Sequence, residues 1–225
     1  MKKQTIVVAG ELSGIGKSIA RLFLDKGDNV VLNSVNTDKI TQLFHELGGG
    51  GNLAVVASNV SDRVTGIKLL ATAVAKFGSV DVLVNNAGVF ETKPFFHVDE
   101  GYLDRFLDTN LKGPFLITQG IIPQMLKQGK GIVINIGMPL INPIRGGAPG
   151  AAVLAPKGAV HALTLQLAAE FGEYNISFNT VTPGIDSKSM HAATEEFIAG
   201  MHLSERTAEV QDIAQMVYAI AKKNL

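Results

Sequence analysis

The sequence contains no cysteine, which excludes disulfide bonds and thiolate metal sites. Its 20 basic residues balance its 20 acidic residues, and this argues against a surface for nucleic acid or anionic membranes. No apolar run is long enough to cross a bilayer, and Glu11 interrupts the first one too early for a signal peptide. We therefore expect a soluble cytoplasmic protein without a metal site, with the terminal pairs Lys2-Lys3 and Lys222-Lys223 in solvent.

The overall composition is typical of a globular domain. Of the 225 residues, 46% are hydrophobic and 18% are charged. This length suits one α/β domain with a sizeable core. Because no linker composition and no internal repeat interrupts the chain, we expect a single domain over residues 1–225.

Short apolar runs alternate with amphipathic stretches along the whole chain. The runs predict strands at residues 5–8, 29–32, 53–57, 80–84, 132–136 and 176–181. The amphipathic stretches predict helices at residues 15–23, 39–47, 64–77, 100–127, 154–171 and 208–221. Such alternation predicts an α/β fold in three layers, a doubly wound parallel sheet with helices on both faces.

The stretch Ala9-Gly10-Glu11-Leu12-Ser13-Gly14-Ile15-Gly16 lies where the first predicted strand gives way to a helix. Glycines there permit backbone angles that a Cβ forbids, and they let a ligand approach the backbone. The N-terminus of the following helix favours an anion. Because the spacing is not G-x-G-x-x-G, the stretch alone fits a phosphate-binding loop or a plain connector, and Glu11 adds a negative charge to it.

Other predicted strands also end in glycine or asparagine. The fourth ends in Asn85-Asn86-Ala87-Gly88, the fifth in Gly137-Met138 and the sixth in Thr182-Pro183-Gly184. In parallel sheets, ligands bind outside the carboxyl ends of the strands. The four endings therefore favour a dinucleotide site over a plain connector.

These motifs, in this order, resemble those of the short-chain dehydrogenase/reductase family nearly end to end, as do Asn110-Leu111-Lys112-Gly113 and Lys157. The resemblance implies a Rossmann-type fold, the cofactor NAD(P)(H), and hydride exchange between a carbonyl and an alcohol of an unknown small molecule. It implies that Lys157 and Asn110 are catalytic. It also implies these cofactor-binding residues: Gly10, Ser13, Gly14, Ile15, Gly16, Ser34, Asn59, Val60, Asn86, Ala87, Gly88, Lys157, Pro183 and Gly184.

The sequence departs from the family at the proton-donating residues. The family tyrosine precedes the lysine by four residues, where Val153 stands here, and the family serine falls at Gly137 or Met138. No Ser, Thr or Tyr occurs between residues 119 and 163. His161 lies one turn beyond the lysine, as a candidate acid or as an ordinary packing residue. Pro156 predicts a displaced helix start, because proline fits only the first turn.

Three functions follow from these residues. The first is an oxidoreductase with weak or altered activity, and the second is an inactive cofactor-binding protein with a regulatory or partner-binding role. The third, a scaffold that has lost the cofactor, is disfavoured by the motifs at Asn86, Gly88, Asn110 and Lys157.

Cofactor choice and assembly are less specified. An acid after the second strand indicates NAD and an arginine indicates NADP, whereas Ser34, Val35 and Asn36 stand here and fit either ribose. The resemblance implies a substrate lid at about residues 185–202, but the usual seventh strand is absent after the last helix. Because family members pair through the two long helices, we expect a homodimer.

Overall fold

The computed structural model describes residues 3–10, 14–138, 149–183 and 209–223. Six strands form one parallel sheet in the order β3-β2-β1-β4-β5-β6. Their bounds are β1 (Thr5–Ala9), β2 (Asn29–Ser34), β3 (Leu53–Ala57), β4 (Val82–Asn85), β5 (Gly131–Ile136) and β6 (Ile176–Val181). The predicted parallel sheet is confirmed, with β1 and β4 as neighbours at its centre.

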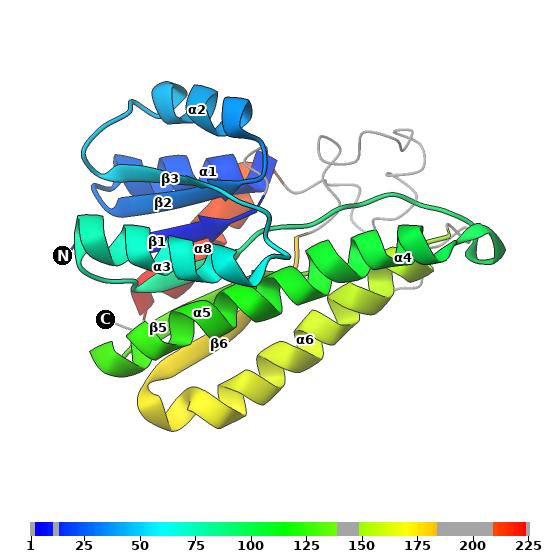
Figure 1. The fold of residues 1–225 in the computed structure, drawn as a ribbon. Coiled ribbons are helices and arrows are strands. Elements are labelled where there is room, and N and C mark those ends of the chain that lie inside the picture. Colours follow the sequence, from blue (N-terminus) through cyan, green and yellow to red (C-terminus); the bar gives the residue numbers. More distant parts are fainter. Residues whose placement is uncertain (1–2, 11–13, 139–148, 184–208, 224–225) are drawn as a thin grey trace.

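Helices cover both faces of the sheet (Figure 1). The bounds of the main helices are α1 (Gly14–Asp25), α2 (Thr37–Glu46), α3 (Arg63–Phe77), α4 (Glu100–Leu107), α5 (Gly113–Gln128), α6 (Ala151–Phe171) and α8 (Val210–Lys223). Side chains alternate along a strand, so Ile6 and Val8 pack toward α1 and α8 while Val7 and Ala9 pack toward α3 and α5. The three-layer prediction is confirmed.

The predicted long helix over residues 100–127 is wrong in one respect, because a π-helical segment at Asp108–Lys112 separates α4 from α5. Pro114 follows this segment directly. Proline has no N–H to donate and its ring crowds the carbonyl four residues earlier, which is that of Asn110. The backbone widens there, and Gly113 N–H bonds to the Asp108 carbonyl instead.

The helix that bears Lys157 also begins earlier than predicted. Helix α6 starts at Ala151 and continues through Pro156, so this proline does not mark the first turn. Val153 N–H and Leu154 N–H both bond to the Gly150 carbonyl, at 3.1 and 2.9 Å. The lysine therefore stays one helical turn after residue 153.

Strand β4 begins two residues later than predicted, at Val82. Val80 is not part of the sheet ladder, because its N–H and carbonyl bond to the Gln128 side chain at 3.0 and 2.8 Å. The other strands lie within two residues of the predicted ranges.

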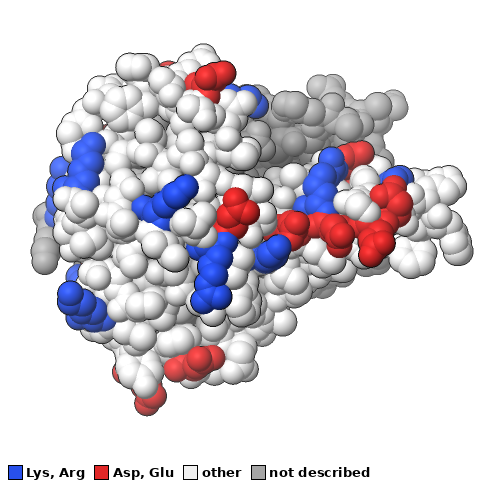
Figure 2. Space-filling model, viewed as in Figure 1, with Lys and Arg blue, Asp and Glu red and all other residues white. Residues whose placement is uncertain are grey.

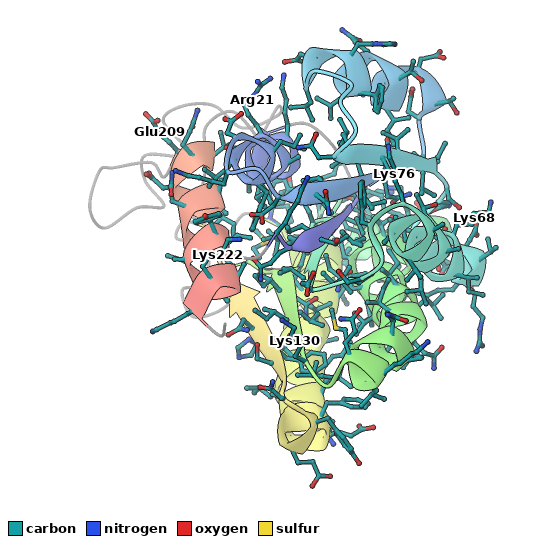
Figure 3. All side chains as sticks on the ribbon, turned by 90° about the vertical axis from the view of Figure 1, so that its left-hand side faces the viewer. Arg21, Lys68, Lys76, Lys130, Glu209 and Lys222 are labelled. Atoms are coloured by element: carbon teal, nitrogen blue, oxygen red, sulfur yellow. The ribbon has the colours of Figure 1, made fainter. Side chains whose placement is uncertain are left out.

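Polar contacts anchor helix α8, which carries Lys222 (Figure 3), to Gln4 and Asp28, the residues that directly precede β1 and β2. Lys222 Nζ lies 2.8 Å from Asp28 Oδ2, and Asp28 Oδ1 also accepts Gln4 N–H at 2.9 Å. The prediction that Lys222 is solvated is therefore wrong. The pair holds α8 beside α1 on one face of the sheet.

Charges of both signs are interspersed over the face seen in Figure 2, in line with the balanced composition. Several form ion pairs, such as Lys112 with Asp108 at 3.0 Å and Lys93 with Asp99 at 2.7 Å. Within the described ranges, no helix combines the length and apolarity needed to span a bilayer.

Candidate functional site

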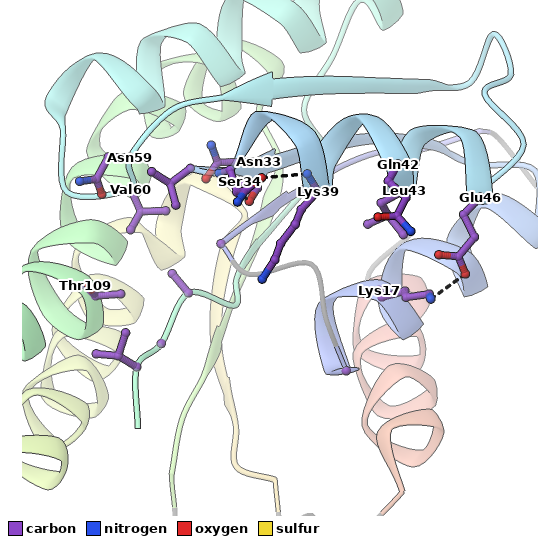
Figure 4. Close-up of a pocket in the computed structure, with 17 residues that line it drawn as sticks. Lys17, Asn33, Ser34, Lys39, Gln42, Leu43, Glu46, Asn59, Val60 and Thr109 are labelled. Atoms are coloured by element: carbon purple, nitrogen blue, oxygen red, sulfur yellow. Dashed lines mark hydrogen bonds and ion pairs between the residues drawn. The ribbon is translucent and has the colours of Figure 1, made fainter. Parts of the chain in front are cut away.

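A cavity of about 520 Å³ opens at the carboxyl ends of the strands (Figure 4). The strand order reverses between β1 and β4, and such a switch point leaves a crevice because the connections depart to opposite sides. Residues that follow β1, β2, β3 and β4 line the cavity, together with side chains of α1 and α2. Seven of the predicted cofactor-binding residues line this cavity: Gly10, Gly14, Ser34, Asn59, Val60, Ala87 and Gly88.

Gly10 lets the chain after β1 contact the chain after β4 at the cavity. Its φ is +115°, and an added Cβ would lie 2.3 Å from the backbone N and Cα of Ala87. The N–H groups of Asn86 and Ala87 both donate to the Ala9 carbonyl at 2.9 Å. Glycine at position 10 therefore allows the close approach of the chain after β1 to the chain after β4, which a Cβ would prevent.

The rest of the predicted glycine motif contributes unequally. Gly14 begins α1 with φ +50° and lines the cavity. Ile15 packs its side chain against the core, and Gly16 is buried inside α1, so neither lines the cavity as the prediction implied. Ser13 lies outside the described residues.

Asn33 lines the cavity and was not predicted. It is 0% exposed, and its Nδ2 donates to the carbonyls of Val56 and Ser58 at 3.0 and 2.9 Å. Its Oδ1 has no partner among the described residues, and an unpaired buried oxygen is costly unless a ligand donates to it. The residues therefore fit a ligand with hydroxyl or amino donors, such as an adenosine. The signal in the sequence was an asparagine inside an apolar strand.

The ends of β2 and β3 supply the next part of the wall. Ser34 is buried, and its Oγ accepts Asn36 N–H at 3.2 Å. Asn59 turns the chain after β3, where its Oδ1 accepts Ser61 N–H at 3.1 Å. Val60 is buried beside it, and all four of Ser34, Asn36, Asn59 and Val60 line the cavity.

Lys157 lies beside Gly88, which lines the cavity, although Lys157 itself is not a lining residue. Its Nζ donates to the Ile136 carbonyl at 2.8 Å and to the Ala87 carbonyl at 3.4 Å. Burial lowers the pKa of Lys157 to about 8, because the ammonium loses solvation. The lysine is thus fixed between the ends of β4 and β5.

Asn110 faces the same glycine from the π-helical segment. Its Oδ1 accepts Val89 N–H at 2.8 Å and its Nδ2 donates to the Val89 carbonyl at 3.1 Å. A Cβ added at Gly88 would lie 3.3 Å from Lys157 Nζ and 3.7 Å from Asn110 Oδ1. The structure therefore brings together the two predicted catalytic residues.

Val153 and Met138 lie in what we call the apolar cluster. The cluster consists of Val89, Val98, Tyr102, Phe106, Met138, Ala152, Val153 and Leu154. Val153 is 1% exposed. A Cβ at Gly137 would lie 2.6 Å from Thr180 Cγ2, which leaves Met138 as the position where a serine side chain fits. The end of β5 and the start of α6 thus meet through hydrocarbon.

Tyr102 belongs to the apolar cluster and His161 lies on α6, so their contacts decide whether either can act as a proton donor. The Tyr102 hydroxyl donates to the Glu91 carbonyl at 3.0 Å, and burial, with the Glu91 charge, raises the pKa of Tyr102. His161 is exposed on α6 and does not line the cavity. Neither side chain is placed as a proton donor.

A buried polar network supports this end of the sheet and was not predicted. Asn85 Nδ2 donates to Thr118 Oγ1 at 3.0 Å and to Asn135 Oδ1 at 2.8 Å. Asn135 Nδ2 donates to Thr164 Oγ1 at 2.8 Å, which lies 3.2 Å from Thr180 Oγ1. The network joins β4, β5 and β6 to helices α5 and α6.

The last predicted residues fall after β6. Pro183 is partly buried and does not line the cavity, and Gly184 and the predicted lid at 185–202 lie outside the described residues. Asn86 is half-buried beside the cavity. Nothing in the described ranges groups three or more His, Cys, Asp or Glu side chains in a manner suited to a metal ion.

The chain is similar to known proteins of one family. The family model described as "short chain dehydrogenase" matches residues 4–198. The chain is 33% identical to the 3-oxoacyl-[acyl-carrier-protein] reductase FabG of Staphylococcus epidermidis over 225 residues, which cover 97% of this chain and 91% of that protein. It is 32% identical to the L-rhamnose-1-dehydrogenase of Scheffersomyces stipitis, over 84% of this chain and 74% of the relative.

A solved structure described as a short-chain dehydrogenase/reductase, glucose/ribitol dehydrogenase, from Brucella melitensis is also similar. It superimposes with a TM-score of 0.86 at 25% identity, covering 99% of this chain and 92% of that one. The sheet order, the family match and the relatives agree, and the chain belongs to the short-chain dehydrogenase family.

Proposed function

We propose that the protein binds NAD(P)(H) in the cavity and exchanges hydride with a small carbonyl or alcohol substrate. We propose further that this enzymatic activity is weak or altered. Members of its family use this cofactor, which supplies or accepts the hydride when bound. The observation that supports the proposal is the contrast at one site: Lys157 and Asn110 are held beside Gly88, whereas Val153 and Met138 lie in the apolar cluster.

The missing step is proton transfer. A carbonyl that receives hydride at carbon needs a proton at oxygen, and neither valine nor methionine has one to give. The Lys157 ammonium is directed at the Ile136 and Ala87 carbonyls. Since a positioned acid typically contributes ~10²–10⁴ in rate, we expect a turnover lower by about that factor than in a site with a phenol.

The substrate class rests on family membership. The relatives named above are a reductase of a 3-oxoacyl group and a dehydrogenase of L-rhamnose, and both names describe carbonyl and alcohol chemistry. For this chain we propose only that shared chemistry. The apolar cluster favours a substrate whose reactive end is flanked by hydrocarbon.

A second candidate function is a cofactor-binding protein without turnover that acts through a partner. The contacts of Asn110 favour it, because both ends of its amide bond to Val89 backbone and its Nδ2 and Oδ1 are engaged. An amide held in this way stabilises the segment after β4 and shapes the cavity. The bound cofactor would then order a surface for the partner, and no reaction would follow.

The test measures cofactor binding and then introduces the absent serine and tyrosine side chains. NADPH and NADH are titrated against the wild-type protein, followed by turnover on a panel of aldehydes, ketones and secondary alcohols. The double variant Met138→Ser, Val153→Tyr is then compared with Met138→Ser, Val153→Phe, which adds the same ring without a hydroxyl. We expect the Tyr variant to gain at least about tenfold in rate over the Phe variant.

Each outcome separates the candidates. Slow wild-type turnover that rises with the phenol supports the first function. Binding with no turnover in either variant supports the second. Rapid turnover by the wild-type protein contradicts the account of Val153, and failure to bind either dinucleotide contradicts both functions.

A further inference from the structure

We propose that Asn135 positions Lys157 through the hydroxyl of Thr164, so that a strand side chain outside the cavity determines where the lysine lies. Asn135 does not line the cavity, and its role is that of a positioning residue. The inference rests on the proposed function for the importance of Lys157 and extends it to the residues that hold this lysine. It depends on the start of helix α6, on the contacts of one buried amide, and on the face of the helix that the amide reaches.

The first two turns of α6 have few anchors of their own. Gly150 at the N-cap offers no side chain to cap the helix, and the first turn carries no acid. Pro156 has no N–H to give to the Ala152 carbonyl, and this gap comes directly before Lys157. Val153 packs in the apolar cluster, but such contacts are not directional and do not fix how far the helix lies along the sheet. The position of the lysine therefore depends on polar contacts made elsewhere.

The lysine itself is held by two backbone carbonyls. Its Nζ donates to the Ile136 carbonyl at 2.8 Å and to the Ala87 carbonyl at 3.4 Å. Ile136 directly follows Asn135 on β5, and Ala87 comes two residues after Asn85, the last residue of β4. Among the described residues Lys157 forms no ion pair, and no charged side chain contributes to its pKa, which burial lowers to about 8. The surroundings of the ammonium thus depend on where α6 lies against β5 and the chain after β4.

The amide of Asn135 joins these same three elements. Its Oδ1 accepts Asn85 Nδ2 at 2.8 Å, which links β5 to β4. Its Nδ2 donates to Thr164 Oγ1 at 2.8 Å, which links β5 to α6. Asn135 is 3% exposed and Thr164 is 4% exposed, so water does not compete for these directional bonds. One side chain therefore fixes α6 relative to both parts of the chain whose carbonyls hold Lys157.

Thr164 lies on the same face of α6 as Lys157. Seven residues separate them, which is nearly two turns at about 3.6 residues per turn and about 10 Å along the helix axis. The Thr164 hydroxyl donates to the Val160 carbonyl at 2.8 Å and lies 3.2 Å from Thr180 Oγ1. Because a hydroxyl has one hydrogen and two lone pairs, the bond from Asn135 fills its capacity. A rotation or sliding of α6 would break these bonds, so they define the register in which the lysine meets β5.

The experiment observes the lysine itself and does not depend on turnover. The full chain is labelled with ¹³C at the lysine ε-carbons, and the signal that disappears in Lys157→Met identifies Lys157 in NMR spectra. Its titration midpoint is then compared between the wild type and Thr164→Val, which keeps the shape of threonine without the hydroxyl. We expect the midpoint to rise by at least about half a pH unit in the variant, toward the ordinary pKa of 10.5, because a loosened helix lets water reach the ammonium.

Thr118→Val is the matched control. Thr118 is 3% exposed and its Oγ1 accepts Asn85 Nδ2 at 3.0 Å, but it lies on α5, which does not carry the lysine. We expect both valine variants to lower the urea concentration at which half of the protein is unfolded, and only Thr164→Val to move the titration of Lys157. Thr164→Ser retains the hydroxyl and should keep the wild-type midpoint. Asn135→Ala breaks the same link from the strand and should move the midpoint as Thr164→Val does.

Each result decides the inference. It is overturned if Thr164→Val and Asn135→Ala leave the midpoint of Lys157 unchanged, if Thr118→Val moves it equally, or if Thr164→Ser moves it as far as valine does. Should Thr164→Val not fold, Asn135→Ala and Thr164→Ser make the same comparison. Titration of the wild type with NADPH and NADH tests the proposed function separately. If neither dinucleotide binds, that function is overturned, and the NMR titration still decides whether Asn135 positions the lysine.

Discussion

Two ends of the site differ in chemistry. At the end that we propose binds adenosine, the polar side chains of Asn33, Ser34 and Lys39 line the cavity. At the other end, beyond Gly88, β5 and α6 meet through Met138 and Val153 in the apolar cluster, and neither of these two residues lines the cavity. We therefore expect cofactor binding and proton transfer to depend on separate elements of this fold, so that substitutions at one end leave the other in place.

The two ends also share a boundary, which runs through the chain after β4. Ala87 packs against Gly10 on the adenosine side, and Gly88 lies against Lys157 and Asn110 on the other. Among the described residues, Lys157 Nζ donates hydrogen bonds to two backbone carbonyls in this boundary, those of Ile136 and Ala87. The lysine thereby joins the chain after β4 to the end of β5.

The largest expected effect comes from Gly10→Ala, which tests whether the adenosine end depends on close backbone approach. The new Cβ would lie 2.3 Å from Ala87 backbone at a φ of +115°, and we expect a loss of about 3 kcal/mol in unfolding free energy together with cofactor binding. Urea denaturation and NADPH titration measure the two losses.

Gly27→Ala is the control for that prediction. Gly27 has φ +83° but nothing within 4 Å of an added Cβ, so it reports backbone strain alone. We expect a loss of about 1 kcal/mol and unchanged NADPH affinity. Equal losses in the two variants would show that the contact with Ala87 does not matter.

Asn135→Leu tests the buried polar network that joins β4, β5 and β6 to helices α5 and α6. It removes the acceptor for Asn85 Nδ2 and the donor to Thr164, both at 2.8 Å, in a residue that is 3% exposed. We expect a loss of about 2–3 kcal/mol because buried partners are left unpaired, while the fragment adenosine 5′-monophosphate still binds. Asn179→Leu removes a contact of 3.5 Å between Asn179 Nδ2 and Ser177 Oγ, and it should cost much less. Loss of fragment binding in Asn135→Leu would contradict the separation of the ends.

Lys157→Met tests how the buried lysine affects the pH dependence of stability. Burial lowers the pKa of Lys157 from 10.5 to about 8, so between these values the unfolded chain holds more protons than the folded chain. The stability of the wild type relative to the variant should therefore rise as pH increases from 8 to 10.5, by at most about 3 kcal/mol. Urea denaturation of both proteins at pH 7, 8, 9 and 10 measures this difference, and parallel profiles would contradict it.

Glu46→Gln has the smallest expected effect. Glu46 is exposed, and removing its charge frees Lys17 on the cavity wall. We expect the affinity for both dinucleotides to rise about twofold at low salt and the gain to vanish at high salt, with an unchanged Tm. A large change in affinity would show that Glu46 contacts the ligand directly.

The sequence was a good guide to the fold because its signals are periodic. Alternating apolar runs and amphipathic stretches predicted the strands and helices, and glycine or asparagine at the strand ends predicted where the cavity opens. The errors arose where a side chain overrides a local pattern. Examples are the widened turn before Pro114, the helix that continues through Pro156, and the side chain of Gln128 that detaches Val80 from its strand.

The site was predicted less completely, for physical reasons. Motif residues such as Gly10 and Asn110 are recognisable in the sequence because the local geometry at each position requires one residue type. The unpaired oxygen of Asn33 depends on which carbonyls lie beside it after folding. In the same way, the ion pair of Lys17 with Glu46 depends on where folding places α1 and α2 relative to each other.

The role of the apolar cluster in limiting proton transfer can be measured directly. NADPH binding and carbonyl turnover are measured on the same samples of the wild type and of the Met138→Ser, Val153→Tyr variant. We predict equal affinity for NADPH within about threefold, and a rate at least about tenfold higher in the variant. Rapid turnover by the wild type that the variant does not increase would contradict the account, because the apolar cluster would then not limit proton transfer.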